Sequence, residues 1–292
     1  MKFATLQTPK GKFVSLVDAG SQRYWPVQDL IPGFTGDMVQ LVQDFDKIRA
    51  GLAPKGEGLP LSQATVLAPV DQPRRNIFCV GKNYYEHAKE FAQSGFDSSA
   101  KAGEDIPEAP IVFTKPFSTV IGPGVKVPSH PTVAKQLDYE AELAVIIGKP
   151  GRGISKADAY SHVFGYTIVN DFTARDLQKT HRQWFLGKSL DGFCPMGPYL
   201  VTADELDVEN LDVKCWINGE LRQDSNTSRL IFDIPTLIET ISAGITLQPG
   251  DVIATGTPAG VGIGFTPPKF VKTGDVMRIE ITGLGSLTNE VD

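Results

Sequence analysis

Three carboxylates alternate with other residues in one short segment of the chain, residues 137–149 (LDYEAELAVIIGK). Side chains of a strand point alternately to two faces, so this spacing predicts Asp138, Glu140 and Glu142 on one face. The row runs into apolar residues, where like charges raise one another's pKa unless a cation neutralises them. A hard divalent cation with oxygen ligands is a natural partner. The alternative is a solvated edge strand whose charges oppose aggregation.

A second acidic segment follows in residues 165–178 (GYTIVNDFTARDLQ). An apolar strand ends there at Asn170 and Asp171, and polar residues at the end of a buried strand are well placed to project into a cleft. Asp171 could therefore complete a metal site with the alternating carboxylates. Alternatively, Asp171 and Thr173 could cap a helix that begins at ARDLQ.

The elements that must position these residues are mostly strands. The chain has 292 residues, of which 41% are hydrophobic, and this suits one large domain or a large domain with a smaller companion. Its 29 Gly and 21 Pro are scattered rather than repeated, so they predict many turns and short strands instead of linkers.

The first seventy residues read as a small α+β unit. Their patterns predict two strands and one helix, at residues 1–7, 12–19 and 36–53. The helix is expected to end near Gly51. A Pro-punctuated passage follows, and we place a domain boundary at its end. This divides the chain into a small N-terminal domain (1–70) and a main domain (71–292).

Strand signals dominate the main domain. They occur in NIFCVG, IVFTKP, LAVIIGK, HVFGYTIVNDF, PYLVT, DVIATGT and DVMRIEITG. Asn218 and Gly219 lie between two further extended runs and predict a tight hairpin, because both turn positions need a positive φ. Helices are predicted after Ser155 (KADAYSHV) and at IPTLIETISAG, the second capped by Gly244. The expected fold is mixed, β-rich α+β with peripheral helices, not a doubly wound Rossmann sheet.

Charge and cysteine content exclude several classes of protein. The formal net charge is −6 and there is no basic run, which argues against a nucleic-acid partner. Cys79, Cys194 and Cys215 form no CxxC pair, which fits a reducing compartment. No apolar run approaches the ~20 residues that span a bilayer, and the first residues lack a signal-peptide core. We therefore expect no membrane association and a cytoplasmic location.

Six motifs together resemble the fumarylacetoacetate hydrolase (FAH) superfamily. In chain order they are NIFCVGKNYYEHAKE, IVFTKPFSTVIGPG, DYEAELAVIIGK, GYTIVNDFTARDLQ, FLGKSLDGFCPMGP and GDVIATGTPAGVG, and they cover roughly residues 75–291. The resemblance implies the FAH-type β-sandwich roll for the main domain. Full-length fumarylacetoacetases carry an additional acidic residue near the metal where this chain has Asn83. The chain thus resembles the shorter, bacterial-type members.

The resemblance also implies a metal site. In the family, the two glutamates of the E-x-E motif and the aspartate of the ND motif bind Mg²⁺ or Mn²⁺. The matching residues here are Glu140, Glu142 and Asp171, which alternation and strand position single out as well. Asp138 is left over, and we expect it to orient a water or a metal ligand from outside the coordination sphere.

The HAKE segment resembles the family's His-x-x-Glu dyad. At positions i and i+3 of a helix, His87 and Glu90 can touch, so the carboxylate would fix the imidazole tautomer and raise its basicity. Without the preceding GKNYYE, an exposed surface pair would be the simpler interpretation. Residues 91–110 are small, polar and poor in core-forming types. The resemblance implies a lid over the substrate, although an ordinary surface loop has the same composition.

Further positions match family residues near the substrate. The resemblance implies substrate contacts for Tyr84, Gln178 and Thr257, and a catalytic lysine beside the metal at Lys188, which could stabilise an oxyanion. Backbone N–H groups of ATGTPAGVG could help to bind a substrate carboxylate. Structural ion pairs are expected for Lys188–Asp191 and Arg175–Asp176.

The shorter members include acylpyruvate and fumarylpyruvate hydrolases, oxaloacetate decarboxylases or tautomerases, and isomerases of aromatic-compound catabolism. The leading expectation is therefore a metal-dependent hydrolase that cleaves a C–C bond in a small 2-oxo or 1,3-diketo acid through a metal-bound enolate. His87 with Glu90 would deprotonate the attacking water, and Lys188 or Gln178 would receive the negative charge.

Three alternatives use the same acidic residues differently. An oxaloacetate decarboxylase or tautomerase, or a 2-oxo-dienoate isomerase, would need the same metal site. A metal-dependent small-molecule binding protein would keep the scaffold without turnover, and a purely structural cation site would have no catalytic role. By family analogy alone, we expect a homodimer.

Overall fold

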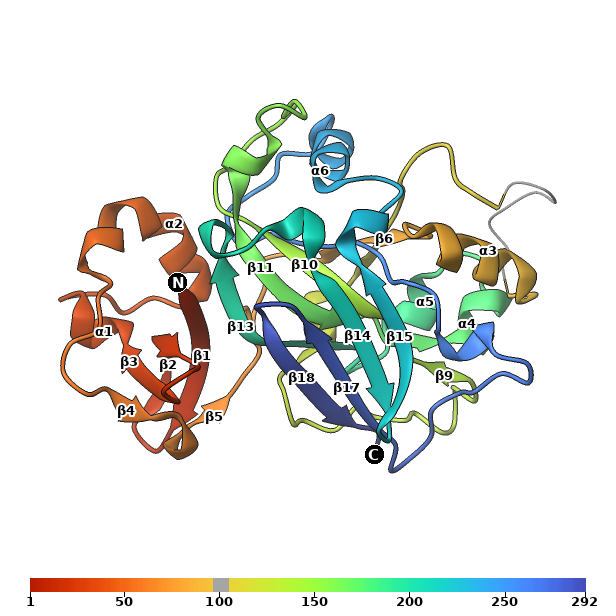
Figure 1. Ribbon diagram of the computed structural model, residues 1–292, viewed down its shortest axis with the longest axis horizontal. Coiled ribbons are helices and arrows are strands. Elements are labelled where there is room, and N and C mark those ends of the chain that lie inside the picture. Colours follow the sequence, from red (N-terminus) through yellow and green to blue (C-terminus); the bar gives the residue numbers. More distant parts are fainter. Residues whose placement is uncertain (97–104) are drawn as a thin grey trace.

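The computed structural model describes residues 1–96 and 105–292, which form a strand-rich fold with a few short helices (Figure 1). The strands are β1 (Lys2–Thr8), β2 (Gly11–Asp18), β3 (Arg23–Pro26), β4 (Leu59–Pro60), β5 (Thr65–Val66), β6 (Ile77–Gly81), β7 (Ile111–Lys115), β8 (Val120–Ile121), β9 (Leu137–Asp138), β10 (Ala141–Ile147), β11 (Val163–Asn170), β12 (Thr173–Ala174), β13 (Cys194–Thr202), β14 (Asp212–Ile217), β15 (Glu220–Asn226), β16 (Val252–Ala254), β17 (Val276–Ile281) and β18 (Gly285–Glu290). The helices are α1 (Val27–Leu30), α2 (Met38–Ile48), α3 (Tyr85–Gln93), α4 (Arg175–Thr180), α5 (Phe185–Lys188) and α6 (Ile234–Ser242).

Two open sheets carry the fold. The larger has twelve strands, in the order β4-β3-β2-β1-β13-β11-β10-β16-β6-β7, with β5 beside β1 and β8 beside β13. The smaller has the order β15-β14-β17-β18, and β9 pairs with β12. The predicted β-rich mixture of strands and peripheral helices is confirmed.

The N-terminal residues form a lobe that shares its sheet with the rest of the protein (Figure 1). The predicted strands and helix are present as β1, β2 and α2, and α2 begins where the Asp37 side chain accepts a hydrogen bond from Gln40 N (2.9 Å). Strand β1 also pairs with β13, with Phe3 opposite Leu200. A division at residue 70 therefore separates two lobes of one continuous sheet.

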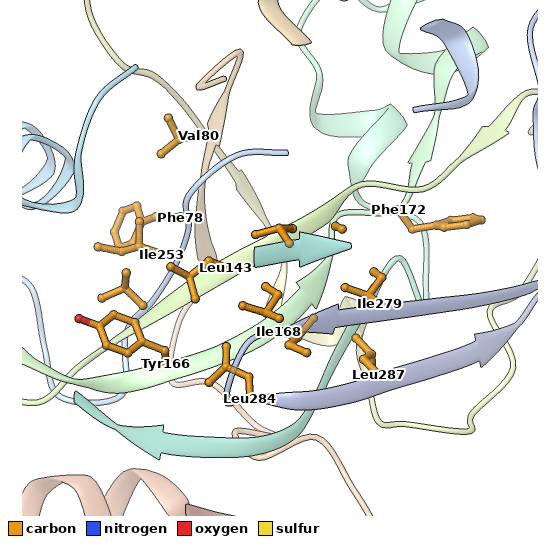
Figure 2. Packing of buried hydrophobic residues seen from close by; sticks show 14 of the residues in the cluster. Phe78, Val80, Leu143, Tyr166, Ile168, Phe172, Ile253, Ile279, Leu284 and Leu287 are labelled. Carbon is orange, nitrogen blue, oxygen red and sulfur yellow. The ribbon is translucent and has the colours of Figure 1, made fainter. Parts of the chain in front are cut away.

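Strand β10 lies within the large sheet and is buried on both faces. On one face Leu143 belongs to a core that includes Ile279 and Leu287 of the smaller sheet (Figure 2). On the other face Ala144 belongs to a core that includes Phe45 of α2. Because both sides of β10 are dry, a carboxylate on this strand needs a cationic partner.

Two local expectations are wrong and one is confirmed. The segment after Ser155 forms only a 3₁₀ turn at Ala159–His162, where the backbone bonds span three residues, as from Ser161 N to the Asp158 carbonyl (2.9 Å). Helix α6 does not end in a left-handed residue, since Gly244 lacks a positive φ. The hairpin at Asn218 and Gly219 is confirmed, with φ values of 51° and 84°.

The three cysteines, Cys79, Cys194 and Cys215, are buried and form no disulfide, as their spacing predicts. Burial raises the pKa of each thiol, so all three stay protonated at neutral pH. None of the helices in the described part of the chain is long and apolar enough to cross a membrane.

Candidate active site

Three of the predicted carboxylates converge at the start of β10. Glu142 lies on β10, Glu140 just before it, and Asp171 just after β11. All three are buried, and one ligand oxygen from each lies within 4.8 Å of the others. The strand register explains this, because Ala141 pairs with Asn170 and Asp171 N donates to the Glu140 carbonyl (2.9 Å). This metal cluster, as we call it, has the oxygen donors that Mg²⁺ or Mn²⁺ prefers.

Two buried lysines contact the metal cluster. Lys188 donates to Glu140 Oε2 (2.8 Å) and to Asp171 Oδ2 (2.7 Å), so its ammonium bridges two of the three carboxylates. Lys115 donates to Asp171 Oδ1 (2.6 Å) and to the Phe172 carbonyl (3.0 Å). The sequence predicts Lys188 beside the metal but does not single out Lys115. Its only signal was its place, a lysine at the end of the apolar strand β7.

Burial and charge shift the two glutamates in opposite directions. Desolvation would raise the pKa of Glu140, but Lys188 and Arg175 outweigh it and lower that pKa to about 2. For Glu142, desolvation and then the charges of Asp171 and Glu140 raise the pKa well above its usual value. A divalent cation would relieve this repulsion, because its charge favours the ionised carboxyl groups. The residues therefore fit a divalent metal ion.

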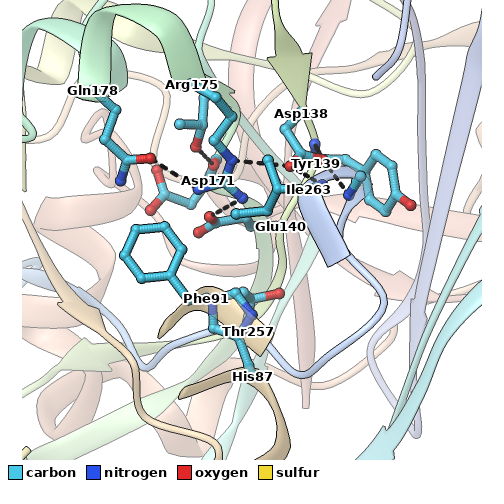
Figure 3. Close-up of polar contacts among 12 residues, drawn as sticks. His87, Phe91, Asp138, Tyr139, Glu140, Asp171, Arg175, Gln178, Thr257 and Ile263 are labelled. Carbon is cyan, nitrogen blue, oxygen red and sulfur yellow. Dashed lines mark hydrogen bonds and ion pairs between the residues drawn. The ribbon is translucent and has the colours of Figure 1, made fainter. Parts of the chain in front are cut away.

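Asp138 stands apart from the other three carboxylates. The break between β9 and β10 directs its side chain to Arg175, whose Nε donates to Asp138 Oδ2 (2.9 Å), while Nη2 lies 2.7 Å from Glu140 Oε1 (Figure 3). The expected pair of Arg175 with Asp176 is wrong, since Asp176 accepts from the backbone N–H of Lys135 instead (2.8 Å). Asp138 thus contacts the metal cluster through Arg175 and is not one of its three carboxylates.

Two other expectations about neighbouring side chains also need correction. Lys188 contacts the metal cluster rather than Asp191, whose carbonyl accepts from the His130 ring (2.9 Å). Helix α4 starts without a side-chain cap, and the Thr173 hydroxyl donates to the Asp171 carbonyl (2.8 Å). The Asp171 carboxylate is therefore not a helix cap and faces the lysines and the metal cluster.

His87 and Glu90 touch as the spacing predicts. His87 Nδ1 lies 3.0 Å from Glu90 Oε2, and His87 is only 4% exposed, so the interpretation as an exposed surface pair is wrong. Glu90 Oε1 accepts from Gly260 N (2.9 Å). Because the carboxylate keeps the ring proton on Nδ1, Nε2 is the nitrogen that can exchange a proton with a ligand.

The glycine-rich loop, residues 256–264, binds carboxylates of the protein itself. Gly256 N donates to Glu142 Oε2 (2.8 Å), and Gly260 N donates to Glu90. The N–H groups of Gly256 and Gly260 are thus taken by the protein's own carboxylates, and binding of a substrate carboxylate by other N–H groups of the loop stays a prediction. The loop therefore touches both the metal cluster and the dyad.

Glu140 and Glu142 of the metal cluster and His87 of the dyad line one small cavity of about 10 Å³, which is room for roughly one water or one ion. Two predicted substrate contacts, Gln178 and Thr257, line it together with Lys188 and Lys82. Tyr84 is fully buried, and it is absent from the cavity lining formed by the part of the chain that the structure describes. A substrate therefore needs neighbouring groups to move before it can enter.

The predicted lid, residues 91–110, lies partly outside the described residues, which omit 97–104. Its first residues belong to α3. Beyond the helix, Phe96 packs edge-on against Phe270 (6.2 Å between ring centroids), and the Lys179 ammonium lies over the Phe96 ring (5.2 Å). The lid function stays a prediction.

The chain is similar to known proteins over most or all of its length. Residues 76–292 match the family model described as fumarylacetoacetate (FAA) hydrolase, C-terminal. The chain is 46% identical to the oxaloacetate tautomerase YisK of Bacillus subtilis (strain 168), and the match covers all of both chains.

Two solved structures resemble the fold along the whole chain. A fumarylacetoacetate hydrolase from psychrophilic Exiguobacterium antarcticum is 40% identical, with a TM-score of 0.83 and 99% of that chain covered. A maleylpyruvate hydrolase from Sphingobium sp. SYK-6, in complex with manganese (II) ion and pyruvate, is 33% identical, with a TM-score of 0.77 and 98% covered. The chain therefore belongs to the fumarylacetoacetate hydrolase family.

Proposed function

We propose that the protein is a divalent-metal-dependent enzyme that interconverts the keto and enol forms of a small 2-oxo dicarboxylic acid, with oxaloacetate as the first candidate. The observation that carries the proposal is the small cavity that is lined by Glu140 and Glu142 of the metal cluster and by His87, whose Nδ1 contacts Glu90. The full-length relative named as an oxaloacetate tautomerase supports the same reaction. Tautomerisation thus replaces C–C hydrolysis as the leading candidate.

Glu140, Glu142 and Asp171 would hold the metal ion. Bound Mg²⁺ or Mn²⁺ would polarise the substrate's 2-oxo group as a Lewis acid. The manganese complex of the maleylpyruvate hydrolase supports a metal of this kind. The charge of the Lys188 ammonium, bridging two of the ligands, would add stabilisation to an oxyanion formed beside it.

Ketonisation of an enol moves one proton from the 2-hydroxyl group to C3, so no atom or electron is gained or lost. His87 Nε2 would take part in this transfer as general acid and base. Glu90 would keep the second ring proton on Nδ1 and stabilise the imidazolium form while Nε2 holds the transferred proton.

Two uncharged side chains of the cavity would orient the substrate. Gln178 Oε1 accepts a hydrogen bond from Arg175 Nη1 (3.1 Å). The amide NH₂ of Gln178 is therefore the group that can donate to a ligand. Thr257 Oγ1 accepts from Gln223 Nε2 (2.8 Å), which leaves the Thr257 hydroxyl proton for a ligand. Both groups therefore offer hydrogen bonds to a substrate carboxylate.

A substrate panel tests the proposal. Oxaloacetate, acylpyruvates, fumarylpyruvate and 2-oxo-dienoates would be incubated with the protein and either Mg²⁺ or Mn²⁺, with products identified by NMR and mass spectrometry. The proposal expects faster keto–enol exchange of oxaloacetate with no change of mass. It fails if oxo acids bind but none is converted, which would instead indicate a binding protein.

Hydrolysis of a C–C bond is the second candidate. The same dyad could activate water, and the maleylpyruvate hydrolase relative favours such chemistry. Hydrolysis yields two products whose masses sum to substrate plus water, so the panel separates it from tautomerisation.

A homodimer remains a prediction by analogy, which sedimentation would test.

A further inference from the structure

Asp138 is a fully buried carboxylate that the proposed mechanism does not use. Its Oδ1 accepts from Gly262 N (2.6 Å), and its Oδ2 accepts from Ile263 N (3.2 Å) as well as from Arg175 Nε. One side chain thus joins the glycine-rich loop to Arg175 of α4. A carboxylate with donors on both oxygens is held in one orientation.

The same loop positions the dyad. Two residues before the Asp138 contact, Gly260 N donates to Glu90 Oε1 (2.9 Å), and the Gly260 carbonyl accepts from the Tyr139 hydroxyl (2.8 Å). A Cβ on Gly264 would lie 1.7 Å from Glu90 Oε1, so the loop also limits the position of Glu90 from its other side. Glu90 is therefore located by a loop that Asp138 anchors.

Glu90 in turn locates the ring of His87. Its Oε2 contacts His87 Nδ1 (3.0 Å), while its Oε1 is the oxygen bound to the loop. A shift of the loop would therefore rotate or withdraw the carboxylate that fixes the His87 tautomer. Four successive contacts join the ring to Arg175, through Glu90, the loop and Asp138.

We propose that Asp138 is a positioning residue that sets the tautomer and orientation of His87 through the glycine-rich loop and Glu90. The inference deepens the proposed function, because it concerns the base of that same site. Asp138 does not line the cavity and does not contact His87; it contacts the lining residue Arg175, and it reaches Glu90 through the loop.

Asp138→Asn is the direct perturbation. The amide keeps the shape of the carboxylate, but its NH₂ must face either the Gly262 N–H or Arg175 Nε–H, and two donors repel each other. We expect the loop to retreat from Asp138 and release Glu90. The matched control is Asp251→Asn, since Asp251 is also buried and accepts from an arginine, Arg75, and from a backbone N–H, Gln248 N.

The readout is the ¹⁵N NMR spectrum of histidine-labelled protein, which contains four histidines. In the unmodified protein, His87 is expected to carry its proton on Nδ1. Asp138→Asn should reduce the Nδ1–H population at least about twofold, whereas Asp251→Asn should leave the His87 signal unchanged. No substrate is needed, so failure of the proposed reaction would not affect this result.

A double-mutant cycle that combines Asp138→Asn with Glu90→Gln tests whether Asp138 acts on His87 through Glu90. If Asp138 acts through Glu90, then adding Asp138→Asn to Glu90→Gln should change the His87 signal no further. An independent effect in the double variant would overturn the proposal, as would an unchanged His87 tautomer in folded Asp138→Asn.

Gly262→Ala breaks the same contact from the loop side and serves if Asp138→Asn does not fold. Its Cβ would lie 2.7 Å from Asp138 Oδ1 and 2.7 Å from the Lys269 carbonyl oxygen, so the loop must shift at its contact with Asp138. It should shift the His87 signal in the same direction. Gly244→Ala is its control, because a Cβ there would meet no atom within 4 Å. Identical His87 signals in the two glycine variants would contradict the proposal.

Discussion

Lys115 and Asp171 form an ion pair, with Nζ 2.6 Å from Oδ1, in which neither side chain has any exposed surface. Because Lys188 contacts the other oxygen, Asp171 is held between two lysines. A buried carboxylate of this kind is stable only while its charge is compensated. The pair therefore fixes the oxygen of Asp171 that Lys188 does not contact.

Replacing Lys115 with Met should lower the free energy of unfolding by about 3 kcal/mol, because it leaves part of the Asp171 charge uncompensated in the interior. Chemical denaturation measures this change. The control is Lys126→Met, which removes a lysine from an exposed pair with Glu290 and should cost less than about 1 kcal/mol. An equal decrease in the free energy of unfolding in the two variants would show that the buried pair stabilises the protein no more than the exposed pair.

Removing one metal ligand should abolish tight metal binding. We expect Glu142→Gln to weaken Mn²⁺ binding about 100-fold, since it replaces a charged oxygen ligand by a neutral amide. Isothermal titration calorimetry measures the affinity. Glu57→Gln, at an exposed position of the N-terminal lobe, should leave it unchanged. Mn²⁺ affinity that survives Glu142→Gln would place the metal elsewhere.

Metal binding should strengthen as pH rises. Burial and neighbouring charges raise the pKa of Glu142 above 4.5, so between pH 4.5 and that raised pKa a metal ion must displace its proton. Over the same window the metal-free protein loses stability with rising pH, because the folded state binds more protons than the unfolded one. Thermal melts at several pH values should show a Mn²⁺-induced increase in Tm that grows with pH. A constant increase across this window would argue against the assignment.

Displacing Glu90 should impair catalysis without weakening metal binding. In Gly264→Ala, the new Cβ meets only the Glu90 side chain within its nearest contacts, at 1.7 Å from Oε1, so the carboxylate must move. We expect kcat to fall at least about 10-fold, since general acid–base catalysis contributes 10²–10⁴-fold, with unchanged Mn²⁺ affinity. Steady-state kinetics at saturating metal measure this. If Gly264→Ala retains full kcat, Glu90 does not position the base.

The metal cluster could be predicted because its ligands follow local rules. Glu140 and Glu142 lie two positions apart at the start of the buried strand β10, and Asp171 follows the end of β11, the next strand along the chain. The antiparallel hairpin of β10 and β11 then brings them together. Strand alternation wrongly places Asp138 beside the two glutamates. The chain is not extended as one strand between β9 and β10, and the Asp138 side chain contacts Arg175 instead.

Contacts between distant segments could not be predicted in this way. Lys115 reaches Asp171 from β7, which lies at the end of the large sheet, and the order of its strands does not follow the sequence. The glycine-rich loop was expected to bind a ligand, since free N–H groups in such loops often do. Only the folded chain shows that Glu90, Glu142 and Asp138 take these donors.

The most direct test of the central claim is the rate at which enol-oxaloacetate loses its ultraviolet absorbance, with saturating Mn²⁺ and with the protein or its His87→Gln variant. The account predicts that the protein accelerates ketonisation and that His87→Gln reduces this acceleration at least about 100-fold, with Mn²⁺ affinity unchanged. An acceleration that His87→Gln retains in full would contradict the joint action of the dyad and the metal cluster.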